Sequence, residues 1–343
     1  MKHLLNTLFV TSEDVYLSLD GENVVANRER REVARYPLHT LSGIVSFSYA
    51  GASPALMGAC AEREVALAFC TPKGRFLARV CGESSGNVLL RRAQYRIADD
   101  PDRCCPLARS MVFGKVYNAR WSIERTCRDH ALRVDAAALK ESSAHLKGLL
   151  SQIAESASMD SLRGLEGAAA TVYFGAFDQL ILAEKPLFAF STRSRRPPLD
   201  PVNALLSFAY SLLAHDCAAA LESVGLDAYV GFLHRDRPGR TSLALDLMEE
   251  LRPCFADRFV LTLINNRVMG RGDFDFRENG AVFLNDAGRR TFLKQWQDRK
   301  RENISHPYLK EKMPWGLVPY IQSLLLARTL RGDLDGYPPF LWK

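Results

Sequence analysis

A histidine and three carboxylates lie close together in the segment GFLHRDRPGRTSLALDLMEELRP, residues 231–253. Asp246 and Glu249 are three residues apart on a stretch with helical spacing, so they share one helix face, with Glu250 at its border. His234 follows an apolar stretch that fixes its backbone. Oxygen ligands with one imidazole suit Mg²⁺ or Mn²⁺, and no set of thiolates competes for zinc. The segment therefore predicts half of a metal site, with a solvated surface helix as the alternative.

A further carboxylate that could bind a metal is Glu166, in the segment SMDSLRGLEGAAATVYFGAF, residues 158–177. Its neighbours are small or apolar, so we expect Glu166 to lie on a tightly packed helix. A carboxylate buried in such a place needs a partner, a proton or a metal ion. The alternative is an exposed residue at the edge of an alanine-rich helix.

Four segments together resemble one known family, the CRISPR-associated spacer-acquisition integrases, the larger protein of the bacterial and archaeal adaptation module. The segments are RGLEG (163–167), DPVNALLSFAY (200–210), GFLH (231–234) and SLALDLMEELRP (242–253). No segment is decisive alone, but with the N-terminal region the resemblance spans nearly the whole chain. It implies a metal-dependent DNA endonuclease and integrase of antiviral defence. Such an enzyme inserts foreign DNA fragments, the spacers, into a CRISPR repeat array by strand transfer from 3′-hydroxyl ends.

The resemblance also implies which residues bind the metal. The family uses a glutamate, a histidine and an acidic residue on the following helix, and these fall on Glu166, His234 and Glu249. Many relatives carry aspartate where this chain has Glu249, so the mode of coordination departs from theirs. Asp246 matches a further acidic position one turn earlier and is a possible auxiliary ligand. The metal that the resemblance implies is Mg²⁺ or Mn²⁺.

The partners come from the resemblance as well. It implies double-stranded DNA, a homodimer formed through the N-terminal domain, and a small ferredoxin-like partner protein of the adaptation module. Two other functions fit the same residues. One is a metal-dependent DNA nuclease that acts in repair without that partner, and the other is a non-enzymatic DNA-binding scaffold whose acidic cluster is only structural.

The positive charge of the chain is clustered. The formal net charge is +6, and basic clusters occur near residues 28, 91, 193, 288 and 298. Arg193, Arg195 and Arg196 lie in a Pro-rich segment, residues 185–203, which we expect to be a long loop. Arginine binds phosphate in a bidentate manner, so these three residues are candidates for DNA binding. A mobile basic linker is the alternative.

Two periodicities divide the chain into two domains. Residues 1–84 alternate in the manner of strands, with a hairpin signal at Asp20-Gly21, whereas residues 85–343 show helical apolar spacing. The sequence predicts an α+β protein with a small, β-sandwich-like N-terminal domain, which carries the dimer contact, and a larger all-helical catalytic domain. Ser242 is the expected N-cap of the helix that carries Glu249.

The cysteines and the hydropathy bear on the cellular location. The chain has eight cysteines and no C-x-x-C pair, and several lie in apolar runs, which favours buried free thiols in a reducing compartment. We find no uncharged apolar run of the roughly 18 residues that a membrane span needs, and no signal peptide. We therefore expect a cytoplasmic protein with no membrane partner.

Overall fold

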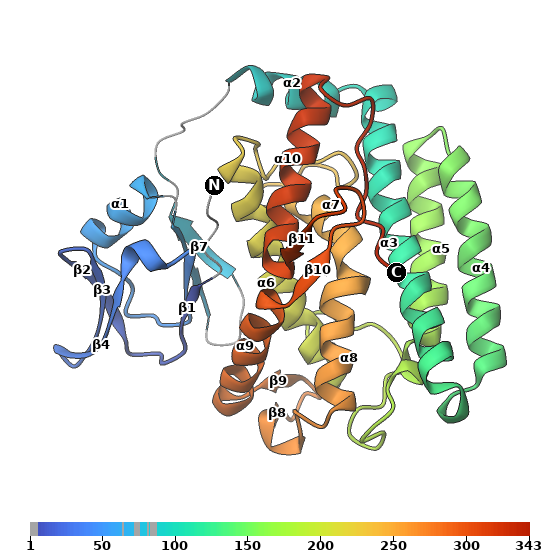
Figure 1. The fold of residues 1–343 in the computed structure, drawn as a ribbon. Helices are drawn as coiled ribbons and strands as arrows, with labels where there is room; N and C mark the ends of the chain where they lie inside the picture. The colour runs from blue at the N-terminus through green and yellow to red at the C-terminus, as the bar shows by residue number, and fades with distance from the viewer. Residues whose placement is uncertain (1–5, 64, 72–75, 81, 83–87) are drawn as a thin grey trace.

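The computed structural model describes residues 6–63, 65–71, 76–80, 82 and 88–343. Two bodies lie side by side, a small β-rich domain and a larger helical domain (Figure 1). The predicted fold class is confirmed. The predicted domain boundary between residues 84 and 85 lies outside the described residues.

The N-terminal domain contains two sheets. The first has the order β1-β5-β6-β7, with β1, β5 and β6 parallel and β7 antiparallel to β6. The second is the antiparallel meander β2-β3-β4. The elements are β1 (Thr7–Val10), β2 (Tyr16–Asp20), β3 (Asn23–Arg28), β4 (Arg31–Pro37), β5 (Gly43–Ser46), α1 (Pro54–Glu62), β6 (Ala66–Cys70) and β7 (Phe76–Val80).

The local sequence explains these elements. The β2–β3 hairpin turns at Gly21, whose φ of 56° lies in the left-handed region that glycine adopts without strain. Helix α1 begins with Pro54 after Ser53, whose side chain accepts a hydrogen bond from the Leu56 backbone N–H. Leu17 and Leu56 are fully buried in the core between the sheets. The hairpin predicted from the sequence is present.

The helical domain contains nine α-helices in the described residues, with two small antiparallel hairpins. The helices are α2 (Val88–Ala98), α3 (Pro101–His130), α4 (Ala136–Glu155), α5 (Met159–Phe177), α6 (Pro201–Ser223), α7 (Ser242–Leu251), α8 (Arg258–Asn265), α9 (Asp286–Arg301) and α10 (Val318–Arg331). The hairpins are β8 (Phe274–Phe276) with β9 (Val282–Leu284), and β10 (Asn303–Ser305) with β11 (Lys312–Pro314). The second domain is therefore not entirely helical, because strands of three residues are too short to show a period of two.

Helix α3 packs against α4, α5 and α7 (Figure 1). Asp100 caps its first turn by accepting from the backbone N–H groups of Asp102 and Arg103, and Pro101 takes the first helical position. Helix α6 is long and apolar enough to cross a membrane by composition, alone among the described helices, and 67% of its most apolar window is buried inside the protein. That burial is typical of a core helix.

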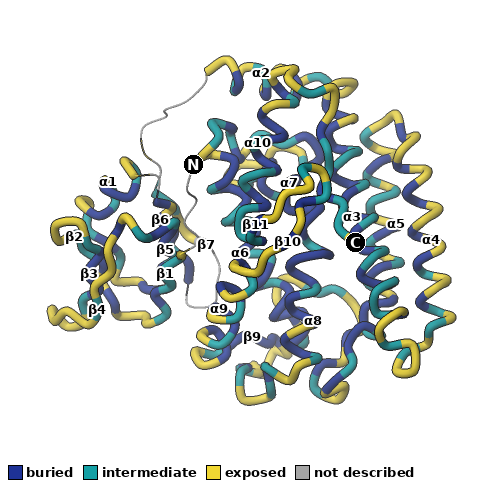
Figure 2. Tube along the Cα trace, in the orientation of Figure 1, coloured by how far each residue is buried: buried dark blue, intermediate teal, exposed yellow. Residues whose placement is uncertain are grey.

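Helix α7 differs from the solvated surface helix that was the alternative prediction. Leu243, Leu247 and Leu251 are buried, and all three carboxylates are buried as well. Figure 2 shows buried positions along the central helices of this domain and exposed positions on the outer helix α4. The N-cap is Thr241 rather than Ser242, and it makes no side-chain cap bond. A wide π-helical turn, Arg252–Asp257, follows α7 and contains a proline, which cannot donate a backbone hydrogen bond.

The described cysteines match the expectation of buried free thiols. All seven of them are buried and unpaired. The long loop expected over residues 185–203 is also found, since no helix or strand begins between the short 3₁₀ turn after α5 and the start of α6.

The sheets contact the helices directly. The Phe47 and Phe208 rings lie 6.0 Å apart, and Gln297 Nε2 donates to the Thr7 carbonyl at 3.0 Å.

Glu250 anchors the last residues of the described chain to the back of α7. Its carboxylate accepts hydrogen bonds from the Tyr337 hydroxyl, from Gln322 Nε2 at 2.9 Å and from the Phe340 backbone N–H at 2.8 Å. A Cβ on Gly114 of α3 would lie 3.0 Å from the Glu250 Cβ, so a larger residue there would have to shift its neighbours by a few tenths of an ångström. The side of α7 that carries Glu250 is thus held by buried polar contacts.

Burial of Glu250 makes protein stability depend on pH. Burial raises its pKa from 4.5 to about 7, against the lowering effect of its hydrogen bonds. Between these two values the folded protein holds a proton that the unfolded chain has lost. The free energy of unfolding therefore falls as pH rises through this window, by about 3 kcal/mol for a shift of this size. The contribution of Glu250 is largest in acid and lost above neutral pH.

We expect Glu250→Gln to remove this pH dependence. The free energy of unfolding is measured in urea from pH 5 to pH 8 for both proteins. The free energy of unfolding of the variant should rise relative to that of the wild type as pH rises, because the amide of the variant does not titrate. Asp257, whose pKa burial raises to about 6, affects both proteins equally and cancels in the difference. Parallel pH curves would show that Glu250 stays ionised in the folded state.

Candidate metal centre

The loop before α7 wraps around the carboxylate of Asp246. That carboxylate is fully buried and accepts from the backbone N–H groups of Phe232 at 2.6 Å, Leu233 at 2.9 Å and His234 at 3.0 Å. A Cβ on Gly231 would lie 2.8 Å from Asp246 Oδ2, so only glycine allows the loop to approach so closely. The motif GFLH is therefore folded around one buried negative charge.

Asp246 also orients the His234 ring. Nδ1 of His234 lies 2.5 Å from Asp246 Oδ1. Because a carboxylate can only accept, the neutral ring carries its proton on Nδ1 and presents a lone pair on Nε2. Nε2 points toward α7 and lies 4.0 Å from Glu249 Oε1. A carboxylate that fixes the tautomer in this way is the usual companion of a histidine that binds a metal through its other nitrogen.

Glu249 is a buried carboxylate between two cations. Its Oε1 lies 3.1 Å from Arg252 Nη2, and its Oε2 lies 2.8 Å from Lys115 Nζ. Burial alone would raise its pKa, but Arg252 and Lys115 outweigh that effect and hold the pKa at about 2. Oε2 makes an ion pair but no hydrogen bond of good geometry. Glu249 is thus ionised, with one oxygen available for a stronger ligand.

Glu166 is brought to the same place from α5. Its Oε1 pairs with Lys115 Nζ, and its side chain is 29% exposed. The expectation of a tightly packed helix around it is wrong. A Cβ on Gly164 or Gly167 would meet no atom within 4 Å, so α5 is open to solvent where these two glycines lie. The carboxylate is neither deeply buried nor isolated, because Lys115 is its partner.

Lys115 is the residue of this site that sequence reasoning missed. It lies on α3, its side chain is 14% exposed, and its ammonium contacts both Glu166 and Glu249. It is the only lysine of that helix, and its register is that of buried Met111 and Ala119, four residues before and after it. A lysine on the buried face of an amphipathic helix was the available signal.

The donor atoms fit a hard divalent cation. They are two ionisable carboxylates and one imidazole nitrogen, without thiolates, and such a set suits Mg²⁺ or Mn²⁺. As the side chains lie, no group of three His, Cys, Asp or Glu in the described ranges is close enough to hold one ion. The Lys115 ammonium contacts both Glu166 and Glu249. Both Asp246 oxygens are taken by protein donors, which favours an orienting role over an auxiliary ligand role.

A cavity of about 530 Å³ lies beside His234. His234 lines it together with Arg163, Arg235 and Asp160, from the start of α5 and the loop before α7.

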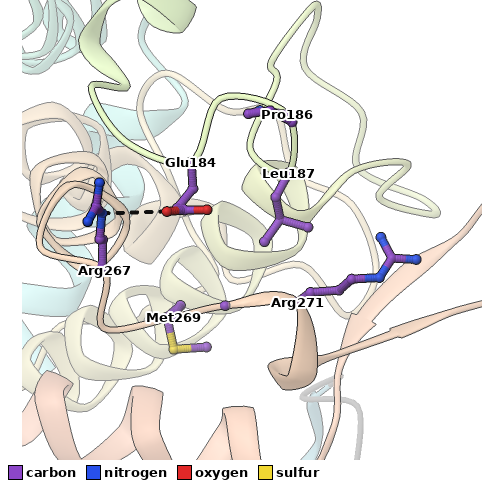
Figure 3. Close-up of a pocket in the computed structure, with 7 residues that line it drawn as sticks. Glu184, Pro186, Leu187, Arg267, Met269 and Arg271 are labelled. Carbon is purple, nitrogen blue, oxygen red and sulfur yellow. Dashed lines mark ion pairs between the residues drawn. The ribbon is translucent and has the colours of Figure 1, made fainter.

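A second cavity, of about 520 Å³, lies elsewhere and is shown in Figure 3. Glu184, Leu187, Arg267, Met269 and Arg271 line it, with Glu184 and Arg267 joined by an ion pair at 3.5 Å. None of the candidate metal ligands lines this second cavity.

The three arginines proposed for DNA binding lie in different surroundings. Arg193 donates from Nη1 to Asn203 Oδ1 at 2.6 Å and from Nη2 to Ser207 Oγ at 3.1 Å. Its guanidinium also lies 5.3 Å from the centre of the Tyr210 ring. Arg195 and Arg196 are exposed. The structure therefore leaves Arg195 and Arg196 available to phosphates, whereas Arg193 is engaged within the protein.

We expect Arg195→Ala with Arg196→Ala to weaken DNA binding evenly across sequences. Each lost phosphate contact flattens the plot of log affinity against log salt by roughly 0.7 to 0.9. Binding is measured from low to moderate salt. The control is Lys140→Ala with Lys147→Ala, which removes the same charge from exposed positions of α4. An unchanged slope in the arginine variant, or an equal change in the control, would end the assignment of DNA contacts to this loop.

The chain is similar to known proteins both in sequence and in fold. The family model described as CRISPR associated protein Cas1 matches residues 8–298. A CRISPR-associated endonuclease Cas1 of Chlorobaculum tepidum is 50% identical over 343 residues, covering 100% of both chains. The chain belongs to the Cas1 family. A second Cas1 endonuclease, from Rhodospirillum rubrum, is 52% identical over 347 residues, again covering 100% of both chains.

The fold agrees with solved Cas1 structures. A Cas1 protein of Thermotoga maritima has a TM-score of 0.80 at 22% identity, covering 95% of this chain and 97% of that one. A casposase bound to an integration product has a TM-score of 0.84 at 22% identity, covering 98% and 94%. The family resemblance inferred from the four segments is confirmed, and this Cas1 chain has the fold that the resemblance implied.

Proposed function

We propose that this Cas1 protein is a metal-dependent DNA integrase that inserts spacers into a CRISPR repeat array by strand transfer. The observation that carries the proposal is the contact of Glu166 and Glu249 with one ammonium, that of Lys115, while Nε2 of His234 lies 4.0 Å from Glu249 Oε1. The relatives of the chain are named CRISPR-associated endonucleases. Glu166, His234 and Glu249 would hold Mg²⁺ or Mn²⁺. When bound, the ion would polarise the phosphoryl oxygen and stabilise the charge on the attacking and leaving oxygens.

The chain's own residues have three tasks in this reaction. Asp246 keeps the proton on Nδ1 of His234, so that Nε2 stays a donor atom. Arg252 pairs with Oε1 of Glu249, the oxygen that does not face Lys115, and so holds the carboxylate in place. Exposed cations outside the centre hold the DNA in register. The 3′-hydroxyl oxygen forms a new bond to phosphorus as the bond to the leaving 3′-oxygen breaks, and the proton passes to that oxygen through solvent. One phosphodiester replaces another, so no external energy source is needed.

The proposed partners are DNA, a second copy of the chain and a small adaptation protein. The casposase neighbour is bound to an integration product, and another neighbour of the same fold, with a TM-score of 0.81, is in a Cas6-RT-Cas1–Cas2 complex. The exposed edge strand β4, with Val33 and Tyr36 exposed, offers a surface for a twofold partner. We place the protein in the cytoplasm, where a repeat array lies.

A strand-transfer assay tests the proposal. It uses the purified protein, its presumed small partner, a short duplex with free 3′-hydroxyls and a plasmid that carries the repeat. We expect duplex joined to plasmid in Mg²⁺ or Mn²⁺, and none with a chelator. Cutting without joining would favour the repair nuclease. Metal-independent binding without cutting or joining would favour the scaffold.

A further inference from the structure

The Lys115 ammonium occupies the position between the two carboxylates that the proposed function assigns to a metal. We propose that Lys115 is a resident cation that holds Glu166 and Glu249 together without metal, leaves them when a divalent ion binds, and thereby lowers the metal affinity of the site. The inference rests on the proposed metal-dependent function. It assigns a task to a residue outside the predicted ligand set.

The charges around Glu249 support this role. Two carboxylates, Glu166 and Glu249, face two cations, Lys115 and Arg252, so the cluster is neutral as it stands. A divalent ion that enters a neutral cluster gains less than one that enters a negative cluster. Two carboxylates so close together would repel without a cation between them. Lys115 therefore stabilises the metal-free site and opposes the metal by the same contacts.

Of the two cations, Lys115 is the one that can leave. Arg252 is enclosed, with its guanidinium 4.8 Å from the centre of the Tyr210 ring. Lys115 has a flexible four-carbon stem and a compact ammonium, and its ion pairs in the described residues are with the two carboxylates alone. The Glu249 oxygen that it faces lacks a hydrogen bond of good geometry. Lys115 is thus held by charge, and a stronger charge can displace it.

Solvent is close to the Lys115 ammonium. Its partner Glu166 is 29% exposed, and the lysine side chain is itself 14% exposed. Rotation of the lysine stem moves its charge toward solvent without disturbing α3. The exchange of Lys115 for a metal ion then needs only a change of rotamer, which takes place far faster than a rearrangement of helices.

The test measures Mn²⁺ binding to the full chain, with no DNA and no activity readout. Lys115→Met keeps the unbranched stem and removes the charge, and Lys115→Gln is a second variant in case the first folds poorly. We expect each to bind Mn²⁺ at least tenfold more tightly than the wild type, by titration followed through the free Mn²⁺ signal. We also expect a lower melting temperature without metal and a larger metal-induced rise.

The control is Lys147→Met, which removes a charge from an exposed position of α4 and should bind Mn²⁺ like the wild type. Equal or weaker Mn²⁺ affinity in both Lys115 variants would overturn the inference while leaving the proposed function standing. An equal gain in Mn²⁺ affinity in the Lys147 variant would show that the effect comes from net charge alone. That result would also overturn the inference. Absence of Mn²⁺ binding in the wild type and in both Lys115 variants would overturn the proposed metal dependence, and the inference with it.

Discussion

Replacing Glu249 by glutamine, Glu166 by alanine or His234 by alanine lowers the rate of strand transfer about 10³-fold or more. The expected loss is large because each change removes one donor from a set of three that act as a unit. The rate is measured with saturating DNA and metal, so that binding does not limit it. Retained DNA binding would show that a variant has lost the chemical step and not the ability to bind its substrate.

The three variants differ in what they do to the folded protein. Glu166 is partly exposed, so its replacement should change the melting temperature little. Glu249 is buried between Lys115 and Arg252, so its loss leaves two cations less well paired and lowers stability. Glutamine keeps the volume, and Glu249→Asp keeps the charge and should retain part of the activity.

An exposed carboxylate serves as the control for these variants. Asp236 lies two residues after His234 and is exposed. Asp236→Ala should leave the rate unchanged, because this carboxylate does not reach Lys115 or Asp246 in the structure. A normal rate in any of the three ligand variants would remove that residue from the metal site. A loss in Asp236→Ala as large as theirs would show that the loop as a whole, and not its donor atoms, is required.

The sequence was sufficient for the elements that carry local signals. The hairpin at Gly21, the helix at Pro54 and the helix after Thr241 each follow from turn, cap or periodicity rules that act over a few residues. The grouping of Glu166, His234 and Glu249 came from the family resemblance, since no local rule links residues so far apart. In the structure Lys115 contacts Glu166 and Glu249, and His234 Nε2 lies 4.0 Å from Glu249 Oε1, so the assignment of the three residues as metal ligands stays a prediction.

The burial of the acidic face of α7 could not be predicted from its own sequence. Periodicity assigns polar residues to solvent, and it has no means to know that other segments will cover them. Glu250 is buried because Gln322, Tyr337 and Phe340 bring donors from residues more than 70 positions later. Lys115 was missed for the same reason, since the two carboxylates that justify a lysine on a buried face lie 51 and 134 residues away along the chain.

The structure also changes what is expected of Asp246. We expect Asp246→Asn to lower the free energy of unfolding by about 3 kcal/mol, because an amide nitrogen would then face backbone N–H groups that have no other acceptor. Strand transfer should fall by about 10- to 100-fold, less than for the ligand variants, since Asp246 acts through His234. Urea unfolding and the transfer rate are measured on the same preparations.

Metal affinity separates an orienting role from a structural one. If Asp246 fixes the His234 tautomer, Asp246→Asn should weaken Mn²⁺ binding by about 10- to 100-fold even under conditions where the variant is fully folded. Gly231→Ala is the matched comparison, because its Cβ would lie 2.8 Å from Asp246 Oδ2 and would disturb the same loop while leaving the carboxylate in place. A stability loss with unchanged Mn²⁺ affinity in Asp246→Asn would make the residue purely structural. A loss of transfer equal to that of Glu249→Gln in a folded variant would instead assign Asp246 to the metal itself.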